Sequence, residues 1–203
     1  MKYFRRIFIA AVTALTLFIL YLEFGGKFIL NDYDKRIITF NIRASKKLPE
    51  NFTYFYNTVY PNSLSSNSWN YVFNALSKSQ SPKKECPCNQ MAYRLFPILE
   101  IKHKKEIDQF ILARFLENNY SQKDCLEFNF NHFDFLEDRK GSVKISQSLF
   151  NKEVKDLQPL EMGEILALYE NPVKYNRNRN PEKAKTRAYH FYNLYLKNLN
   201  NHN

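Results

Sequence analysis

Cysteine and histidine are characteristic zinc ligands, and cysteine can also form disulfides; this 203-residue chain has few of either. The cysteines are Cys86, Cys88 and Cys125, and the four histidines stand at positions 103, 132, 190 and 202. Zinc sites recur as paired clusters of ligands, and these histidines show no ligand spacing. We therefore predict no metal site and no cofactor.

The odd number of cysteines cannot form a closed set of disulfides. Cys86 and Cys88 are separated by one residue, which is too close for a common structural bridge. Outside the cytoplasm Cys125 could pair with either of them, or all three could stay reduced. The sequence leaves these alternatives open.

Positive charge is concentrated near the N-terminus. The net charge is +10, and residues 1–48 hold nine Lys/Arg against three Asp/Glu, a net of +6. The remaining residues contribute only +4, from 21 basic and 17 acidic side chains. This distribution argues against nucleic acid as the partner.

An uncharged apolar run follows the basic N-terminus, from Ile7 to Leu22. Its length lies between that of a signal-peptide core and that of a full membrane span. The flank YLEFGG lacks the small residues of a cleavage site, which favours an uncleaved anchor over a cleaved signal peptide. The basic flank then predicts a single-pass inner-membrane protein with a cytoplasmic N-terminus and residues 25–203 outside.

Basic side chains continue after the apolar run. Two interpretations fit them: contact with lipid phosphates at the outer membrane face, or a solvated stalk. They are Lys27, Lys35, Arg36, Arg43, Lys46 and Lys47.

Helical spacing predicts most of the remaining elements. We expect helices over 69–76, within 103–121, over 143–150 and over 160–169, and an exposed loop over 77–84. In the second helix Ile107, Phe110, Ile111 and Phe115 share a face. Ser121 and Asp124 form a variant capping box that starts another helix. Residues 48–61 alternate too loosely to assign, no strand is convincing, and the predicted fold class is all-α.

The last helix has a clear start. Asn180 can cap it through the side-chain oxygen, and Pro181 suits the first helical position because that N–H is unpaired anyway. An apolar stripe along it is expected to face the core. The stripe consists of Ala184, Ala188, Phe191 and Tyr195.

The segment from residue 161 onward resembles the end of the peptidoglycan glycosyltransferase (transglycosylase, glycosyltransferase family 51) domain of penicillin-binding proteins. Its matching residues are Glu161, Leu166, Ala167, Pro172, Tyr175, Asn176, Asn180, Pro181, Ala184 and Arg187. Further upstream the matches are Gly141, Phe150, Lys152 and Leu157, and before those Ala113, Leu116, Glu117, Tyr120, Ser121, Leu126, Glu127 and Asn131. A fainter match consists of Gln90, Leu95 and Phe96. The resemblance covers residues 48–196 and implies a lysozyme-like helical domain behind a membrane anchor.

The resemblance also implies two catalytic glutamates, and both are missing at the matching positions. The first position falls on Tyr60, followed by Pro61, and the second falls on Gln109. No Asp or Glu occurs from Asn51 to Lys84, so shifting the alignment within that segment restores no acid. The remaining candidates for relocated acids are Glu106, one turn before Gln109, and Glu85.

The other matching residues suggest binding or structural roles. Gln90 and Arg187 could still contact sugar or pyrophosphate oxygens, and Tyr175 fits either role. We expect the remaining motif residues to cap helices and hold loops. They are Glu117, Glu127, Asn131, Glu161, Pro172, Asn180 and Pro181.

Three hypotheses result. The first is a transglycosylase-like pseudoenzyme that binds a lipid-linked precursor, glycan or another wall-synthesis protein. Its chain would consist of a cytoplasmic tail and anchor (1–24), a basic connector (25–47) and a transglycosylase-like domain (48–203). The second is an active glycosyltransferase with relocated acids. The third is an unrelated anchored basic protein that binds anionic lipid.

Overall fold

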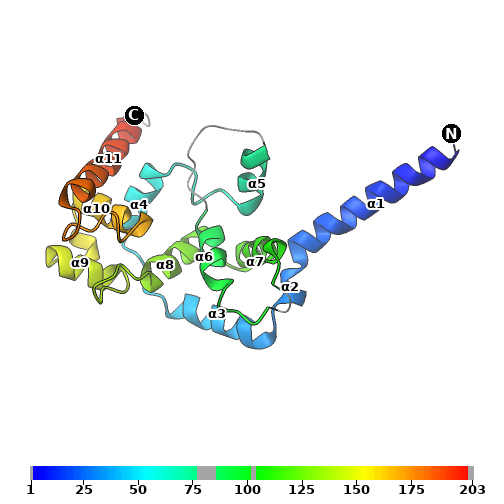
Figure 1. Ribbon diagram of the computed structural model, residues 1–203, viewed down its shortest axis with the longest axis horizontal. Coiled ribbons are helices and arrows are strands. Elements are labelled where there is room, and N and C mark those ends of the chain that lie inside the picture. The colour runs from blue at the N-terminus through cyan, green and yellow to red at the C-terminus, as the bar shows by residue number, and fades with distance from the viewer. Residues whose placement is uncertain (1, 77–85, 102–103, 201–203) are drawn as a thin grey trace. The chain divides into compact units, whose positions relative to one another are not determined.

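A computed structural model describes residues 2–76, 86–101 and 104–200 (Figure 1). The predicted loop 77–84 and Glu85 lie outside these residues. Within the described ranges the regular structure is helical, apart from one isolated antiparallel bridge between Asp134 and Lys140. The all-α prediction is confirmed. The chain divides into two compact units, and each is considered by itself.

Unit 1 comprises six helices and the start of a seventh. They are α1 (Lys2–Phe24), α2 (Gly26–Ile29), α3 (Asp32–Ala44), α5 (Ser68–Leu76), α6 (Pro87–Leu95), α7 (Glu106–Asn119) and the first turn of α8 (Gln122–His132). Helices α2 and α3 occupy the segment that the sequence analysis treats as a connector. The predicted domain limits themselves remain predictions.

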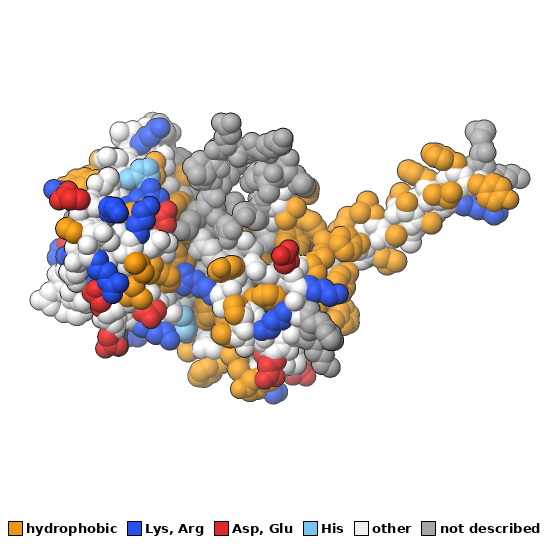
Figure 2. All heavy atoms as spheres, viewed as in Figure 1, with side chains coloured by type: hydrophobic (Ala, Val, Ile, Leu, Met, Phe, Trp, Pro, Cys, Tyr) orange, Lys and Arg blue, Asp and Glu red, His pale blue; other side chains and the backbone are white. Residues whose placement is uncertain are grey.

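Helix α1 contains 22 residues, Tyr3–Phe24, that are long and apolar enough to cross a membrane. A signal sequence would satisfy the same criteria of length and composition. Figure 2 shows hydrophobic side chains uncovered along this helix. Its C-terminal end, in contrast, packs against α7. The next helix, α2, also packs against α7: a Cβ on Gly26 would lie 2.4 Å from the Cβ of Phe115, so only glycine permits this approach.

Helix α7 buries more than the face that the sequence predicts. Of the four residues predicted to share a face, Ile111 is fully buried and the other three are half-buried. Leu112 and Leu116 are also fully buried. The reason is that α7 packs against α1, α2, α5 and α6, so it buries more than one face.

Unit 2 comprises α4 (Glu50–Val59), the rest of α8, α9 (Ser142–Phe150), the 3-10 helix η1 (Val154–Asp156), α10 (Pro159–Glu170) and α11 (Pro181–Asn200). Helix α4 lies in the segment 48–61, whose loose alternation predicts no element. Its buried side chains Phe52, Phe55, Tyr56 and Val59 nevertheless follow helical spacing. The predicted helices over 143–150 and 160–169 are confirmed as α9 and α10.

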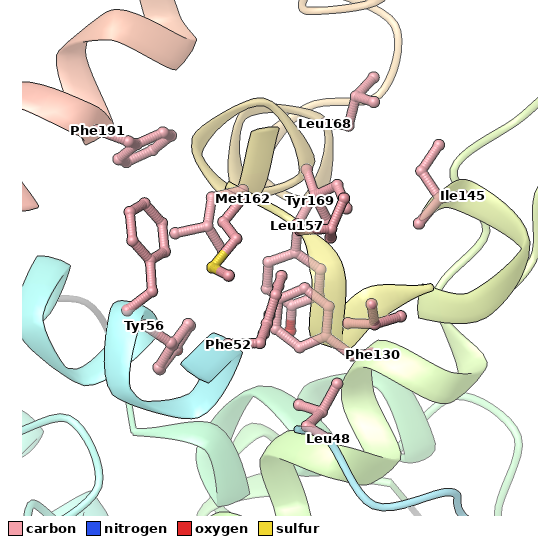
Figure 3. Packing of buried hydrophobic residues seen from close by; sticks show 14 of the residues in the cluster. Leu48, Phe52, Tyr56, Phe130, Ile145, Leu157, Met162, Leu168, Tyr169 and Phe191 are labelled. Carbon is pink, nitrogen blue, oxygen red and sulfur yellow. The ribbon is translucent and has the colours of Figure 1, made fainter. Parts of the chain in front are cut away.

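Aromatic rings form much of the core of unit 2 (Figure 3). Phe130 meets Phe52 edge-on with ring centroids 5.1 Å apart and stacks on Tyr169 at 4.3 Å. Both geometries are favoured by the ring quadrupoles. Helix α11 contributes Phe191, which is 1% exposed.

Helix α11 begins at Pro181 as predicted, and Ala184, Ala188 and Phe191 of the predicted stripe are buried. The side-chain cap differs from the prediction. The hydrogen bond that Asn180 makes through its side chain is a donation from Nδ2 to the Val173 carbonyl at 3.4 Å. Its main-chain carbonyl accepts the first helical bond, from Ala184 N at 3.0 Å.

Helices α10 and α11 cross closely at Gly163. A Cβ there would lie 2.8 Å from the Ala188 carbonyl oxygen, and a backbone atom cannot move aside as a flexible side chain can. The small residue therefore sets the separation of the two helices.

We expect Gly163→Val to destabilise unit 2 by about 1–3 kcal/mol, because the added atoms force the helices apart. Glycine and valine both have low helix propensity, so propensity contributes little of this loss. Chemical denaturation followed by circular dichroism measures the effect. Asn193→Val, at an exposed position of α11, is the control. Equal stability of the two variants would contradict the close crossing.

Candidate functional site

Tyr60, at the first predicted acid position, directly follows α4 and packs among aromatic rings. Its ring centroid lies 5.2 Å from that of Tyr56 and 5.9 Å from that of Phe191. Burial, with a further contribution from the nearby Glu170 carboxylate, raises the pKa of the Tyr60 phenol above its usual value. The phenol is therefore protonated at neutral pH.

Gln109, at the second predicted acid position, is half-buried in the first turns of α7. An amide neither gains nor loses a proton in the physiological range. Glu106 is the first residue of α7 and is exposed, and it makes no ion pair with any other described residue. The other fallback acid, Glu85, lies outside the described residues.

Unit 1 holds a network of charged side chains centred on Arg114 of α7. The guanidinium binds Glu23 at the end of α1 through two hydrogen bonds, of 2.9 and 2.6 Å. It also donates to the carboxylate of Glu117, one turn along α7. The Arg114 and Glu117 side chains are 9% and 5% exposed, so this pairing is shielded from water. The bond to Glu23 joins the apolar helix to the rest of unit 1.

The Glu117 carboxylate extends the network to α5 and α6. Its Oε1 accepts hydrogen bonds from the backbone and hydroxyl of Ser68, at 2.8 and 2.9 Å, and from the thiol of Cys86, at 3.2 Å. The Glu117 carboxylate thus joins the starts of α5 and α6 to α7. In addition, the indole of Trp69 donates a hydrogen bond to Glu23 at 3.0 Å.

The cysteines resolve the alternatives that the sequence left open. Cys88 and Cys125 form a disulfide that joins α6 to the start of α8. Cys86 is a free, buried thiol. Burial and the neighbouring Glu117 carboxylate raise the pKa of Cys86 to about 12, so this thiol is not a reactive nucleophile. Among residues 2–76, 86–101 and 104–200, no group of three His, Cys, Asp or Glu is arranged to hold a metal.

The predicted capping box of α8 forms as expected: Asp124 Oδ2 accepts from Ser121 N at 2.9 Å, and Ser121 Oγ accepts from Asp124 N at 3.1 Å.

Other motif residues hold loops in unit 2. Asn131 donates to the Lys46 carbonyl at 2.7 Å. Glu161 accepts from Gln158 N at the start of α10 and pairs with Lys152, both at 2.8 Å.

The three predicted ligand contacts do not fall in one unit. Gln90 lies half-buried on α6 in unit 1. Tyr175 and Arg187 meet in unit 2, with the guanidinium carbon 5.8 Å from the centre of the tyrosine ring. Both line a cavity of about 390 Å³ beside α11. We refer to it as the α11 groove.

Several residues of these sites are not among those predicted from the sequence. Glu23 is predicted only to be unsuited to a cleavage site, although it is a lone carboxylate at the end of an apolar run. In the α11 groove, Glu182, Lys183, Thr186 and His190 were missed. They recur at the spacing of one helix face, which is the signal that could have found them.

A family model described as Transglycosylase matches residues 88–195, more than half of the chain. The chain belongs to the transglycosylase family. The hypothesis of an unrelated basic protein is therefore wrong.

This transglycosylase-family chain is similar in sequence to penicillin-binding proteins. Penicillin-binding protein 1A of Neisseria lactamica is 29% identical over 125 residues, which are 62% of this chain and 16% of the relative. Penicillin-binding protein 1F of Bacillus subtilis is 32% identical over 98 residues, 48% of this chain and 14% of the relative. The matched segment is thus a small part of each relative's length.

We expect Arg114→Leu to destabilise unit 1 by about 3–5 kcal/mol, because it leaves the shielded carboxylate of Glu117 without its cation. Arg36→Leu, at an exposed position of α3, should change stability by no more than about 0.5 kcal/mol. Urea denaturation of both variants in neutral detergent provides the comparison. A similar loss in both would show that the network contributes nothing specific.

Proposed function

We propose that this chain is a membrane-anchored member of the transglycosylase family that does not polymerise glycan and acts as a binding or regulatory pseudoenzyme in cell-wall synthesis. The proposal rests on the identity of the residues at the two positions where the family resemblance implies catalytic acids. Tyr60 and Gln109 stand there, and no Asp or Glu occurs from Asn51 to Lys84.

The chemistry that the family resemblance implies requires a base for the attacking sugar hydroxyl and an acid near the leaving pyrophosphate. A tyrosine phenol is protonated at neutral pH, and burial raises the pKa of Tyr60 further, so it cannot accept that proton. Gln109 cannot supply a proton to the leaving group. Tyr60 is partly buried and also has a packing role, against Tyr56 and Phe191.

An active enzyme with relocated acids is the alternative. Glu106 stands one helical turn from Gln109, a displacement of about 5 Å, and proton transfer requires hydrogen-bond contact. Its exposure keeps it in water rather than in an enclosed site. These points favour the pseudoenzyme, and the assay below distinguishes the two.

The ligand of the pseudoenzyme would be a lipid-linked precursor, glycan or another wall-synthesis protein. Tyr175, Arg187 and Gln90 are the proposed contacts. Amide and guanidinium groups bind sugar and phosphate oxygens without acid–base chemistry. The fixed geometry of Arg187, held by Glu170 through bonds of 2.6 and 2.7 Å, supports this role.

We further propose that α1 is a retained anchor with the rest of the chain outside the cytoplasm. The contact of Glu23 with Arg114 supports retention, because cleavage after Glu23 would remove one of the two carboxylates that pair with a buried guanidinium. The Cys88–Cys125 disulfide supports the location, because such bridges persist in oxidising compartments.

The purified full chain should form no glycan polymer from lipid-linked disaccharide. Loss of general-base catalysis alone typically costs about 10²–10⁴-fold in rate, and both acids are absent from their positions. The assay is chain formation beside an active family member. Polymer made by the wild-type chain and lost in Glu106→Gln or Glu85→Gln would overturn the proposal and establish the relocated-acid enzyme.

The membrane-extracted protein should retain its N-terminal segment and give an intact mass close to 24.3 kDa. The double variant Tyr21→Ala/Glu23→Ala is the control, because it introduces a small-x-small cleavage signal and should be shortened. A wild-type product that lacks its first twenty-odd residues would refute the anchor.

A further inference from the structure

Helix α5, in unit 1 (Figure 1), carries no charged residue. It lies within a stretch from Asn51 to Ser77 that contains no charge at all. A surface helix usually carries charged or polar side chains on its outer face, yet Phe73 of α5 is 62% exposed and Val72 is half-buried. Helix α5 precedes residues 88–195, so the family match does not account for this apolar face.

The start of α5 is fixed beside the end of the apolar helix α1. The indole of Trp69 donates a hydrogen bond to Glu23 of α1 at 3.0 Å. Ser68 donates from its backbone and its hydroxyl to Glu117 of α7, at 2.8 and 2.9 Å. Both carboxylates pair with Arg114. One network of charged side chains therefore holds the start of α5 level with the end of α1.

Glu23 indicates the depth of this contact relative to a bilayer. It is the first charged side chain after the apolar run that begins at Ile7. A carboxylate within the hydrocarbon core is costly, so Glu23 belongs at the level of the lipid head groups when α1 spans the membrane. Trp69, in hydrogen-bond contact with it, lies at the same level. Tryptophan favours this level because its ring is apolar while its N–H can donate.

Further aromatic rings lie at this level. Phe73 stacks on Trp69, with ring centroids 6.1 Å apart. On α1, Tyr21 and Phe24 lie within one turn of Glu23 and are 44% and 50% exposed. A single exposed aromatic ring is ordinary on a protein surface. A group of such rings at the end of a helix of membrane-spanning length instead matches the aromatic belt of membrane proteins.

We propose that α5 is an interfacial helix, which lies among the lipid head groups with the Phe73 ring inserted between the acyl chains. Lipid is the occupant of this face because Trp69 contacts the last turn of a helix long enough to cross a membrane. The inference rests on the proposed retention of α1 as an anchor. A single spanning helix can tilt and rotate, and a second contact in the interface restricts both motions of unit 1.

Trp69 is the only tryptophan of the chain, so its fluorescence reports the surroundings of α5 directly. The test uses the full chain in phosphatidylcholine vesicles, one set of which carries bromine on the acyl chains as a quencher within the bilayer. Iodide in the buffer is the aqueous quencher. We expect the brominated lipid to reduce Trp69 emission about twofold or more, and iodide to reduce it little.

Phe73→Glu should decrease the quenching by brominated lipid about twofold or more, because a carboxylate avoids the acyl chains. Phe73→Ser should change it in the same direction, and this variant adds no charge that could repel Glu23. Phe40→Glu is the matched control. It makes the same substitution at a phenylalanine of α3 that is 72% exposed, and it should leave the quenching unchanged. Circular dichroism checks that each variant is folded.

Absence of bromine quenching in the wild-type chain, or equal effects of Phe73→Glu and Phe40→Glu, would overturn the interfacial helix. Protection of Trp69 from both quenchers would show that protein rather than lipid covers this face, and would also overturn it.

The intact mass of the same sample separates this inference from the anchor proposal. A chain of about 24.3 kDa without bromine quenching would overturn the interfacial helix and leave the anchor in place. A shortened chain would overturn the anchor and, with it, the inference.

Discussion

The pairing of Arg114 with Glu23 and Glu117 is the interaction on which unit 1 depends. One guanidinium bridges the end of the apolar helix α1 and the middle of α7, and Glu117 then holds the starts of α5 and α6. A charge shielded from water is costly unless it is paired, so these contacts must form together. The apolar helix is consequently part of the unit that follows it, rather than a loosely attached tether.

Unit 2 is organised differently, by aromatic packing and a close helix crossing. Rings from α4, α8, α10 and α11 interlock in its core, and Gly163 lets α11 approach α10. At the end of this crossing Glu170 and Arg187 pair beside Tyr60. Burial and the carboxylate of Glu170 disfavour a negative charge at Tyr60, and their combined effect outweighs the opposite effect of the Arg187 guanidinium.

Several motif residues of this transglycosylase-family chain serve its fold. Motif residues such as Glu117, Asn131 and Glu161 make hydrogen bonds that hold helices and loops. Packing and loop contacts can persist without proton transfer, because they depend on shape and hydrogen bonding rather than on a tuned pKa.

The sequence by itself determined the helical class, the apolar segment, the start of α11 at Pro181 and the absence of acids from Asn51 to Lys84. These follow from local spacing, capping chemistry and composition. Only the tertiary structure decided that Cys88 rather than Cys86 pairs with Cys125, that Glu23 meets Arg114, and that α4 is a helix with a buried face. The physical reason is distance along the chain: Glu23 and Arg114 are 91 residues apart, and no local pattern specifies which charges meet once the helices pack.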